Sequence, residues 1–248
     1  MIDFIDKRID KWKRSVRKRV AIRRLERIPQ NAPKNCVIVA SNGRSGSTLT
    51  FLALAEALKE VDPVSANKVD FVARLSDTEF YAPCVYKTHD FPQPLSTWPE
   101  NTRVVFCFGP TKDSAFSVFS AKERYGADWI DQHFYHLHAT GTFDELFERD
   151  VLQQAKQIKE WITFEDVPVL CVRYDALWDH QETISRFTGL EFTPPKRRER
   201  TPKDIPEEFK TSADRLYDPI DEVIDQLPEC FIASAQYKSV VDKLPVTD

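Results

Sequence analysis

Residues 36–49 read Cys-Val-Ile-Val-Ala-Ser-Asn-Gly-Arg-Ser-Gly-Ser-Thr-Leu and carry the strongest structural signal in the chain. The first six residues are a short apolar, β-branched run of the kind that fills a buried parallel strand. Two glycines and several small hydroxyl residues follow, and residues 49–59 are good helix formers throughout. The segment therefore predicts a strand, a glycine-bearing turn and a helix, which together make the first βα unit of an α/β fold.

Further strands and helices alternate along the chain. Strands are predicted at 84–89, 103–109 and 168–174, and helices at 112–122, 143–162 and 181–188. Thr111 or Asp113 would start the first of these helices, and Gly189 would end the last. Strands that alternate with helices indicate a parallel sheet covered on both faces. We expect a three-layer α/β domain of the P-loop NTPase-like kind over residues 31–248, with a central parallel sheet flanked by helices.

The N-terminal segment differs in charge from the rest of the chain. The 248 residues carry a net charge of −4, yet residues 1–28 alone carry +7, which leaves −11 for the remainder. Apolar residues recur every three or four positions in this basic segment, so it predicts an amphipathic helix over residues 1–30. Such a helix could dock on its own domain, lie on an anionic membrane surface or bind nucleic acid. Interleaved aromatic residues that would stack on bases are missing, and we expect no nucleic-acid partner.

Simple patterns exclude several classes of protein. No run approaches the 18 consecutive apolar residues of a transmembrane helix, and no apolar core follows the N-terminal charges as in a secretory signal. The five cysteines are scattered singly, which fits small buried side chains in a reducing compartment rather than disulfides or zinc. We therefore expect a cytoplasmic protein, with any peripheral membrane contact made through residues 1–28.

The turn at residues 41–48 has the composition of an anion-binding loop. Its glycines let backbone N–H groups wrap an anion, and the N-terminus of the following helix adds a favourable dipole. Against the P-loop pattern GxxxxGK[ST], Ser41 stands at the first glycine and Ser47 at the lysine. That lysine contacts the β- and γ-phosphates of ATP or GTP, so its absence disfavours an ordinary nucleoside triphosphatase. Arg44 supplies a cation to the same loop.

Four segments, in this order, resemble the sulfotransferases that use 3′-phosphoadenosine 5′-phosphosulfate (PAPS). Residues 43–49 look like the family's 5′-phosphosulfate loop, and residues 86–92, Tyr-Lys-Thr-His-Asp-Phe-Pro, are similar to its KTHxP-like strand end. Residues 103–117 look like the 3′-phosphate strand and helix, and residues 172–177, Val-Arg-Tyr-Asp-Ala-Leu, resemble the RYEDL segment. The resemblance covers roughly residues 36–190.

The resemblance implies a role for each matching residue. His89 would be the general base that takes a proton from the acceptor, while Lys87 and Arg44 would stabilise charge on the donor. Ser117 would contact the 3′-phosphate, and Tyr174 would lie near the adenine. The 5′ phosphosulfate would be bound by Arg44, Ser45, Gly46, Ser47, Thr48 and Leu49. No metal is expected.

The chemistry of sulfuryl transfer agrees with these roles, because it depends on positioning and charge stabilisation. A hydroxyl acceptor needs a base near neutral pH, and histidine has a suitable pKa. His89 follows a predicted strand, at the edge where open α/β sheets bind ligands. Residues at alternate strand positions share a face, so Lys87 and His89 should point into one site.

The chain departs from the family pattern at two positions. The family's 3′-phosphate arginine falls on Gly109, which has no side chain to pair with a phosphate. Either other cations hold this phosphate or the donor is not PAPS. The candidate cations are Lys112 and the cluster Lys196, Arg197, Arg198 and Arg200, of which we place Arg198 and Arg200 at the site. The frequent tryptophan after the loop is Leu49 here, so the adenine would need another stacking partner.

We therefore expect an enzyme that moves a sulfuryl group from PAPS to an acceptor hydroxyl and releases adenosine 3′,5′-bisphosphate. A small-molecule, glycan or lipid acceptor fits the aromatic-rich segments 60–82, 122–142 and 193–215, which would shape its pocket. Two alternatives stay open: a P-loop small-molecule kinase, and a catalytically silent member of the fold that binds a phosphorylated ligand or partner. Three histidines lack a carboxylate or cysteine at metal-ligand spacing and are placed on an acceptor-side loop, namely His133, His136 and His138.

Overall fold

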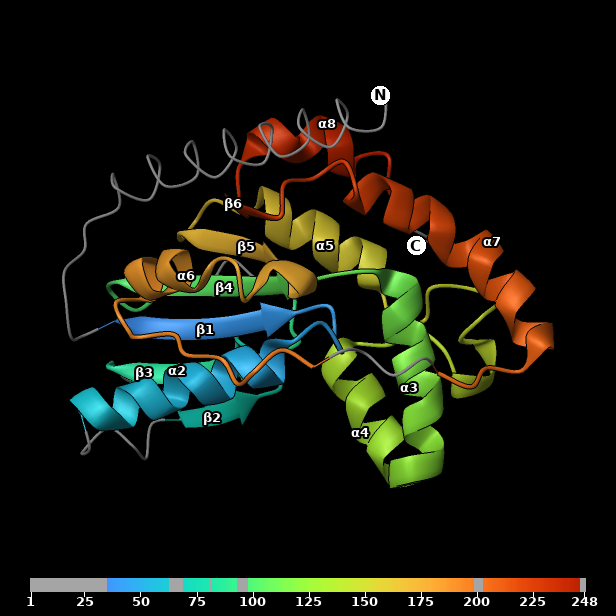
Figure 1. Cartoon of the computed structure of the whole chain (residues 1–248), viewed down its shortest axis with the longest axis horizontal. Helices are drawn as coiled ribbons and strands as arrows, with labels where there is room; N and C mark the ends of the chain where they lie inside the picture. Colours follow the sequence, from blue (N-terminus) through green and yellow to red (C-terminus); the bar gives the residue numbers. More distant parts are fainter. Residues whose placement is uncertain (1–34, 63–68, 81, 93–97, 199–202, 246–248) are drawn as a thin grey trace.

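A six-stranded sheet forms the centre of the structure and is covered by helices on both faces (Figure 1). The computed structural model describes residues 35–245 apart from 63–68, 81, 93–97 and 199–202. The predicted basic helix over residues 1–30 lies outside the described residues, as does Arg200. Within the described part of the chain, the sheet and its flanking helices confirm the expected α/β architecture.

The sheet is mostly parallel, with β1 (Cys36–Ser41) in its interior. The strand order is β2-β3-β1-β4-β5-β6, where the other strands are β2 (Val69–Val72), β3 (Cys84–Thr88), β4 (Thr102–Phe108), β5 (Val169–Arg173) and β6 (Cys230–Ile232). β6 pairs antiparallel with β5, and the other pairs are parallel. From β1 the chain runs to β2 and β3 on one side and then crosses to β4 and β5 on the other. This reversal is the kind of switch point at which open α/β sheets bind ligands.

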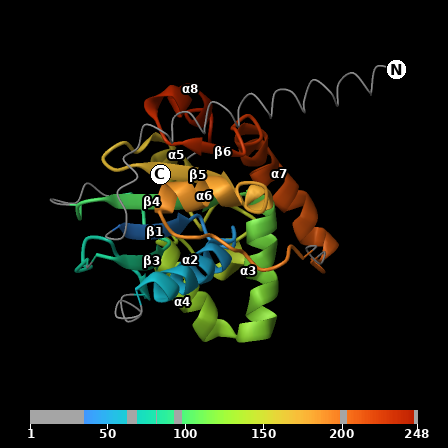
Figure 2. The same cartoon turned by 60° about the vertical axis from the view of Figure 1, so that its left-hand side comes forward.

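Alternate residues of β1 face two different hydrophobic cores. Ile38 and its neighbours on one face pack with α3 (Thr111–Tyr125), α5 (Gln154–Thr163) and α7 (Glu207–Ile224). Val37 and Val39 face the opposite core, which includes α2 (Ser47–Val61) and α6 (Gln181–Thr188) (Figure 2). Because both faces are covered, every residue of β1 is buried, and the strand reads as an uninterrupted apolar run.

The predicted helix over residues 143–162 is wrong. A 3₁₀ turn, η2 (Phe143–Glu145), occupies its start, and α5 begins only at Gln154. Gln153 has a left-handed φ of 53°, and the Asp150 carboxylate accepts the N–H of Ala155 at 2.9 Å, which caps α5. Burial raises the pKa of Asp150 to about 6. The apolar spacing in this segment therefore reflects burial of turns rather than one continuous helix.

Two other predictions about helices need correction. His133 and His136 lie on a regular helix, α4 (Ala127–Leu137), and not on a loop. Neither Thr111 nor Asp113 caps α3 with its side chain; the N–H and hydroxyl of Thr111 instead donate to the Asp221 carboxylate of α7.

A short helix, α8 (Lys238–Val241), follows β6. None of the helices in the described residues is long and apolar enough to cross a membrane. The five cysteines are all buried as free thiols.

Candidate functional site

A cavity of about 750 Å³ opens beyond the carboxyl ends of the parallel strands. Its walls come from the β1–α2 turn, the ends of β2 and β3, the first turns of α3, helix α4 and the residues after β5. Nine of the twelve residues predicted from the sequence line it, namely Arg44, Gly46, Ser47, Thr48, Leu49, Lys87, His89, Ser117 and Tyr174. Four separate segments of the chain thus meet at one hollow in the described structure.

Two predicted residues in the described chain lie off the cavity. The buried hydroxyl of Ser45 is 2.8 Å from both Asn42 Oδ1 and the Gly43 carbonyl oxygen, so it supports the shape of the turn. Arg198 is exposed and does not line the cavity. Lys203, from the same basic loop, lines it instead.

The β1–α2 turn brings the N-terminus of α2 to the cavity. Gly43, Arg44 and Gly46 have φ values of 82°, 51° and 88°, and this left-handed backbone turns the chain sharply into α2. Ser47 and Thr48, the first residues of α2, line the cavity, and among the described residues no side chain caps this helix. The N-terminus of α2, the positive end of its dipole, therefore lies at the wall of the cavity, where it would favour a bound anion.

His89 is oriented by Ser41 of β1. Its Nδ1 lies 3.1 Å from the Ser41 carbonyl oxygen and 3.0 Å from Ser41 Oγ. A carbonyl oxygen only accepts hydrogen bonds, so Nδ1 carries the proton and Nε2 keeps its lone pair. Ser41 Oγ also accepts the N–H of Gly43 at 3.2 Å and donates to Ser47 Oγ at 2.8 Å. A single buried serine therefore joins the imidazole to the anion-binding turn.

The protonation state of His89 suits a proton acceptor. Burial holds the pKa of His89 well below the usual value of 6.5. The positive charge of Lys87 lowers this pKa further, and so does the nearby His133. His89 is therefore neutral at pH 7. With Nδ1 committed as a donor, its other nitrogen is the atom that could take a proton from a bound hydroxyl.

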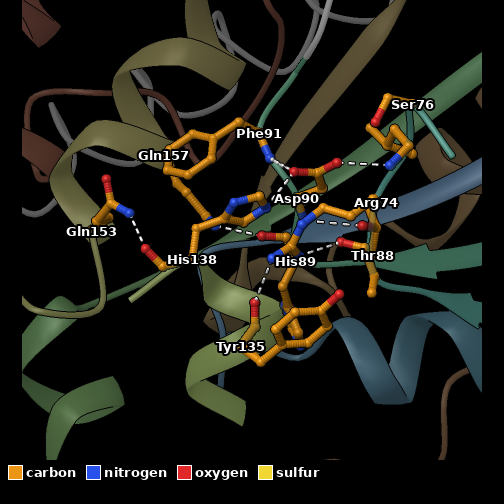
Figure 3. Close-up of polar contacts among 12 residues, drawn as sticks. Arg74, Ser76, Thr88, His89, Asp90, Phe91, Tyr135, His138, Gln153 and Gln157 are labelled. Atoms are coloured by element: carbon orange, nitrogen blue, oxygen red, sulfur yellow. Dashed lines mark hydrogen bonds and ion pairs between the residues drawn. The ribbon is translucent and has the colours of Figure 1, made fainter. Parts of the chain in front are cut away.

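The segment that follows β3 is anchored on several sides (Figure 3). The His89 carbonyl oxygen accepts a hydrogen bond from Gln157 of α5 at 2.5 Å. The adjacent Asp90 is fully buried, accepts the N–H of Leu75 at 2.7 Å and contacts His138 Nε2 at 2.5 Å. These contacts hold the strand end from both sides and fix the backbone on which the His89 ring is mounted.

Lys87 and Arg44 bring positive charge to the same cavity. The Lys87 amine lies 4.6 Å from the ring centre of Phe71. Burial of this amine and the positive charge of Arg44 lower the pKa of Lys87 to about 8. Arg44 donates from Nε to Ser117 Oγ at 2.8 Å and lies 5.7 Å from the ring centre of Trp129. Ser117, predicted to contact a 3′-phosphate, thus contacts the loop arginine here.

Helix α4 lies in the segment 122–142 that was expected to shape the acceptor pocket, and it supplies further lining residues. His133 stacks on Trp129 with ring centres 4.6 Å apart, and Gln132 and His136 line the same wall. Burial, Arg44 and Lys87 lower the pKa of His133 to about 3, so it too is neutral. The spacing of residues 129, 132, 133 and 136 marks one helical face, and this signal was available in the sequence.

The charge of the lining favours an anionic ligand. Arg44, Lys87 and Lys203 are its cations, and Asp113 is the one acidic residue among the described lining residues. The described residues contain no group of three or more His, Cys, Asp or Glu side chains that could hold a metal ion. The arrangement can bind an anion beside a neutral imidazole that is ready to accept a proton.

Anion affinity should fall as the pH rises through about 8. Lys87 is charged below its pKa of about 8 and neutral above it, so the attraction is present at pH 7 and lost by pH 9.5. We expect the Kd of adenosine 3′,5′-bisphosphate, measured by calorimetry, to rise roughly tenfold over this range. The Lys87→Arg variant keeps its charge and should show a nearly flat profile. An equal loss of affinity in the arginine variant would contradict this assignment.

Comparison with known proteins assigns no family to this chain. No family model matches it, and no curated protein gives a match either. Evidence of function therefore comes from the cavity and from the four segments that resemble sulfotransferases.

Proposed function

We propose that the chain is a sulfotransferase that moves a sulfuryl group from PAPS to an acceptor hydroxyl. The observation that carries this proposal is the hydrogen-bonded unit of His89, Ser41 and Ser47, which joins a neutral base to an anion-binding turn. Acyl and phosphoryl transfer sites combine the same two elements, a positioned base and a fixed set of oxyanion donors. In a sulfotransferase the base would activate the acceptor hydroxyl and the oxyanion donors would bind the phosphosulfate, so that the hydroxyl displaces the leaving group in line at sulfur.

On the donor side, the β1–α2 turn would hold the 5′ phosphosulfate. The N–H groups at the start of α2 and the hydroxyls of Ser47 and Thr48 are the donors available there. Arg44 and Lys87 would neutralise charge that develops on the bridging oxygen as the S–O bond breaks. Tyr174, which packs on Gly46 and lines the cavity, would support the adenine.

On the acceptor side, His89 Nε2 would take the hydroxyl proton as the new O–S bond forms. The electron pair of the broken S–O bond stays on the phosphate oxygen, and adenosine 3′,5′-bisphosphate leaves. The acceptor would enter between β2 and α4, where Phe71, Gln132 and His136 line the wall. These aromatic and polar side chains suit a sugar, lipid headgroup or phenol hydroxyl alike.

The kinase alternative is less well supported by the same turn. The lysine that contacts the β- and γ-phosphates in P-loop kinases is replaced by Ser47, whose hydroxyl accepts from Ser41. A catalytically silent binding protein would share the anion loop but would have no need for an oriented base. The tautomer fixed on His89 therefore favours the transferase.

Three ligands separate these functions in one series of measurements. A transferase should bind adenosine 3′,5′-bisphosphate without magnesium and should move ³⁵S from labelled PAPS to a hydroxyl acceptor in a screened panel. A kinase should prefer magnesium-ATP, and a silent protein should bind an anion without any transfer. Binding of magnesium-ATP in preference to the bisphosphate would refute the proposal.

A further inference from the structure

The buried carboxylate of Asp90 contacts three segments on the acceptor side of the cavity (Figure 3). Its Oδ2 accepts the N–H of Leu75, which follows β2, at 2.7 Å. Its Oδ1 accepts the N–H of Phe91, which follows β3, at 2.9 Å and lies 2.5 Å from Nε2 of His138, the residue that ends α4. A carboxylate only accepts hydrogen bonds, so His138 Nε2 is the donor. One side chain therefore joins the segments after two strands to the C-terminal end of α4.

The C-terminal end of α4 has further contacts on both sides. Arg74 donates to the Tyr135 carbonyl oxygen at 3.1 Å, and its guanidinium lies 4.4 Å from the centre of the Tyr135 ring. The His138 carbonyl oxygen accepts a hydrogen bond from Gln153, and His138 itself has a left-handed φ of 55°. A shift of the last turn of α4 would therefore separate His138 from Asp90.

These contacts connect the base to the wall that would face an acceptor. His89 directly precedes Asp90, and its ring is held by Ser41, so the carboxylate acts on the backbone that carries the base. His133 of α4 lines the cavity, with its ring centre 5.7 Å from that of His89. The spacing between the base and this wall thus depends on the point at which Asp90 and His138 meet.

We infer that Asp90 is a positioning residue for the acceptor half of the site: through His138 it sets the distance between the His89 base and the α4 wall. This inference rests on the proposed sulfotransferase function. The β1–α2 turn, which would hold the donor, has its own hydrogen bonds from Ser41 and Ser45, so we expect its shape to survive loss of this pair. Misplacement of a reacting group by about 1 Å can cost about 100-fold in rate. Loss of the Asp90–His138 contact should therefore impair use of the acceptor and spare nucleotide binding.

Two substitutions of His138 test this inference on the full chain. His138→Leu removes the donor to Asp90 and should lower kcat/KM for the acceptor by about 10-fold to 100-fold. The Kd of adenosine 3′,5′-bisphosphate, measured by calorimetry, should stay within about threefold of wild type. His138→Gln keeps an N–H donor near the position of Nε2, and its kcat/KM should stay within about threefold of wild type. An unchanged kcat/KM in His138→Leu, an equal loss in both variants, or a matching loss of nucleotide affinity would overturn the inference and leave the proposed function standing.

A buried hydrogen bond elsewhere in the fold provides the matched control. The Tyr217 hydroxyl of α7 donates to the Leu146 carbonyl oxygen at 2.7 Å, and Tyr217 does not line the cavity. Tyr217→Phe should therefore unfold at a lower urea concentration than wild type but keep its kcat/KM.

Hydrogen exchange of α4 gives a measurement that needs no acceptor. The amides of residues 131–137 should exchange about tenfold faster or more in His138→Leu than in Tyr217→Phe, whereas those of residues 50–58 in α2 should exchange alike in the two variants. Unchanged exchange in α4 would contradict the contact between Asp90 and His138 as its anchor. If α4 exchanges faster but wild type sulfates no acceptor in the panel, the proposed function fails, and the role of Asp90 in catalysis fails with it.

Discussion

Replacing His89 with alanine should lower the turnover number for sulfuryl transfer by roughly 100-fold to 10,000-fold, while adenosine 3′,5′-bisphosphate still binds. The imidazole is neutral and its Nδ1 donates to Ser41, so its loss removes the proton acceptor without removing a charged contact to the donor. The turnover number from ³⁵S transfer and the Kd from calorimetry are the two measurements. The wild-type kcat/KM, which reports the free enzyme, should show no acid limb near pH 6.5, because the pKa of His89 lies well below that value.

A second buried histidine provides the control for this experiment. His180 is about as buried as His89 but lies before α6, away from the lining of the cavity, so His180→Ala should retain its turnover number if the fold survives. Added imidazole should restore part of the activity of His89→Ala, since a free base can enter the space that the ring leaves. A His89→Ala variant that turns over within tenfold of wild type, or that loses nucleotide binding in proportion to activity, would rule out the assigned role.

The parts of the fold that the sequence predicted well are those whose local pattern and tertiary role agree. β1 is buried on both faces and is flanked by a glycine turn, so its apolar run, its ends and the helix after it could be read directly. α6 ends at Gly189, whose φ of 73° is the left-handed cap that the sequence predicted. β2 and β6 were missed because they have four and three residues and take their pairing from neighbours far along the chain.

The candidate site was predictable mainly where residues lie at or just after the end of a strand. Lys87 of β3 and His89, which directly follows this strand, are two residues apart, and both line the cavity as expected. The packing of α4 and of α7 against α3 depends on contacts between distant elements, so the helical face of α4 could be read from local spacing but its position at the cavity could not. Asp221 in particular lies 110 residues after Thr111, and no short-range pattern connects the two.

Gly46→Ala should cause the largest loss of both stability and nucleotide binding among substitutions in the turn. An added Cβ would lie 2.5 Å from Tyr174 Cδ2 and 2.9 Å from Leu177 Cδ1, and the backbone there has a φ of 88°. Left-handed strain costs an alanine about 1 kcal/mol, and overpacking against a buried side chain adds about 1–3 kcal/mol. We expect urea unfolding to show a loss of roughly 2–4 kcal/mol and calorimetry to show bisphosphate binding weakened by more than about tenfold.

Gly189→Ala separates the backbone strain from the clash. Gly189 has a similar left-handed conformation, with φ 73° and ψ 12°, but its added Cβ would meet only the end of the Asn35 side chain, at 3.0 Å. The free energy of unfolding of this control should fall by about 1 kcal/mol, and its nucleotide affinity should not change. The difference between the two variants then measures how tightly Tyr174 and Leu177, which follow β5, press on the turn that follows β1. If both variants lose the same free energy and Gly46→Ala still binds the bisphosphate normally, contact with Tyr174 does not set the shape of the anion-binding turn. The adenine support and the phosphosulfate loop would then be independent of each other, and the two ends of the proposed donor site would have to be explained separately.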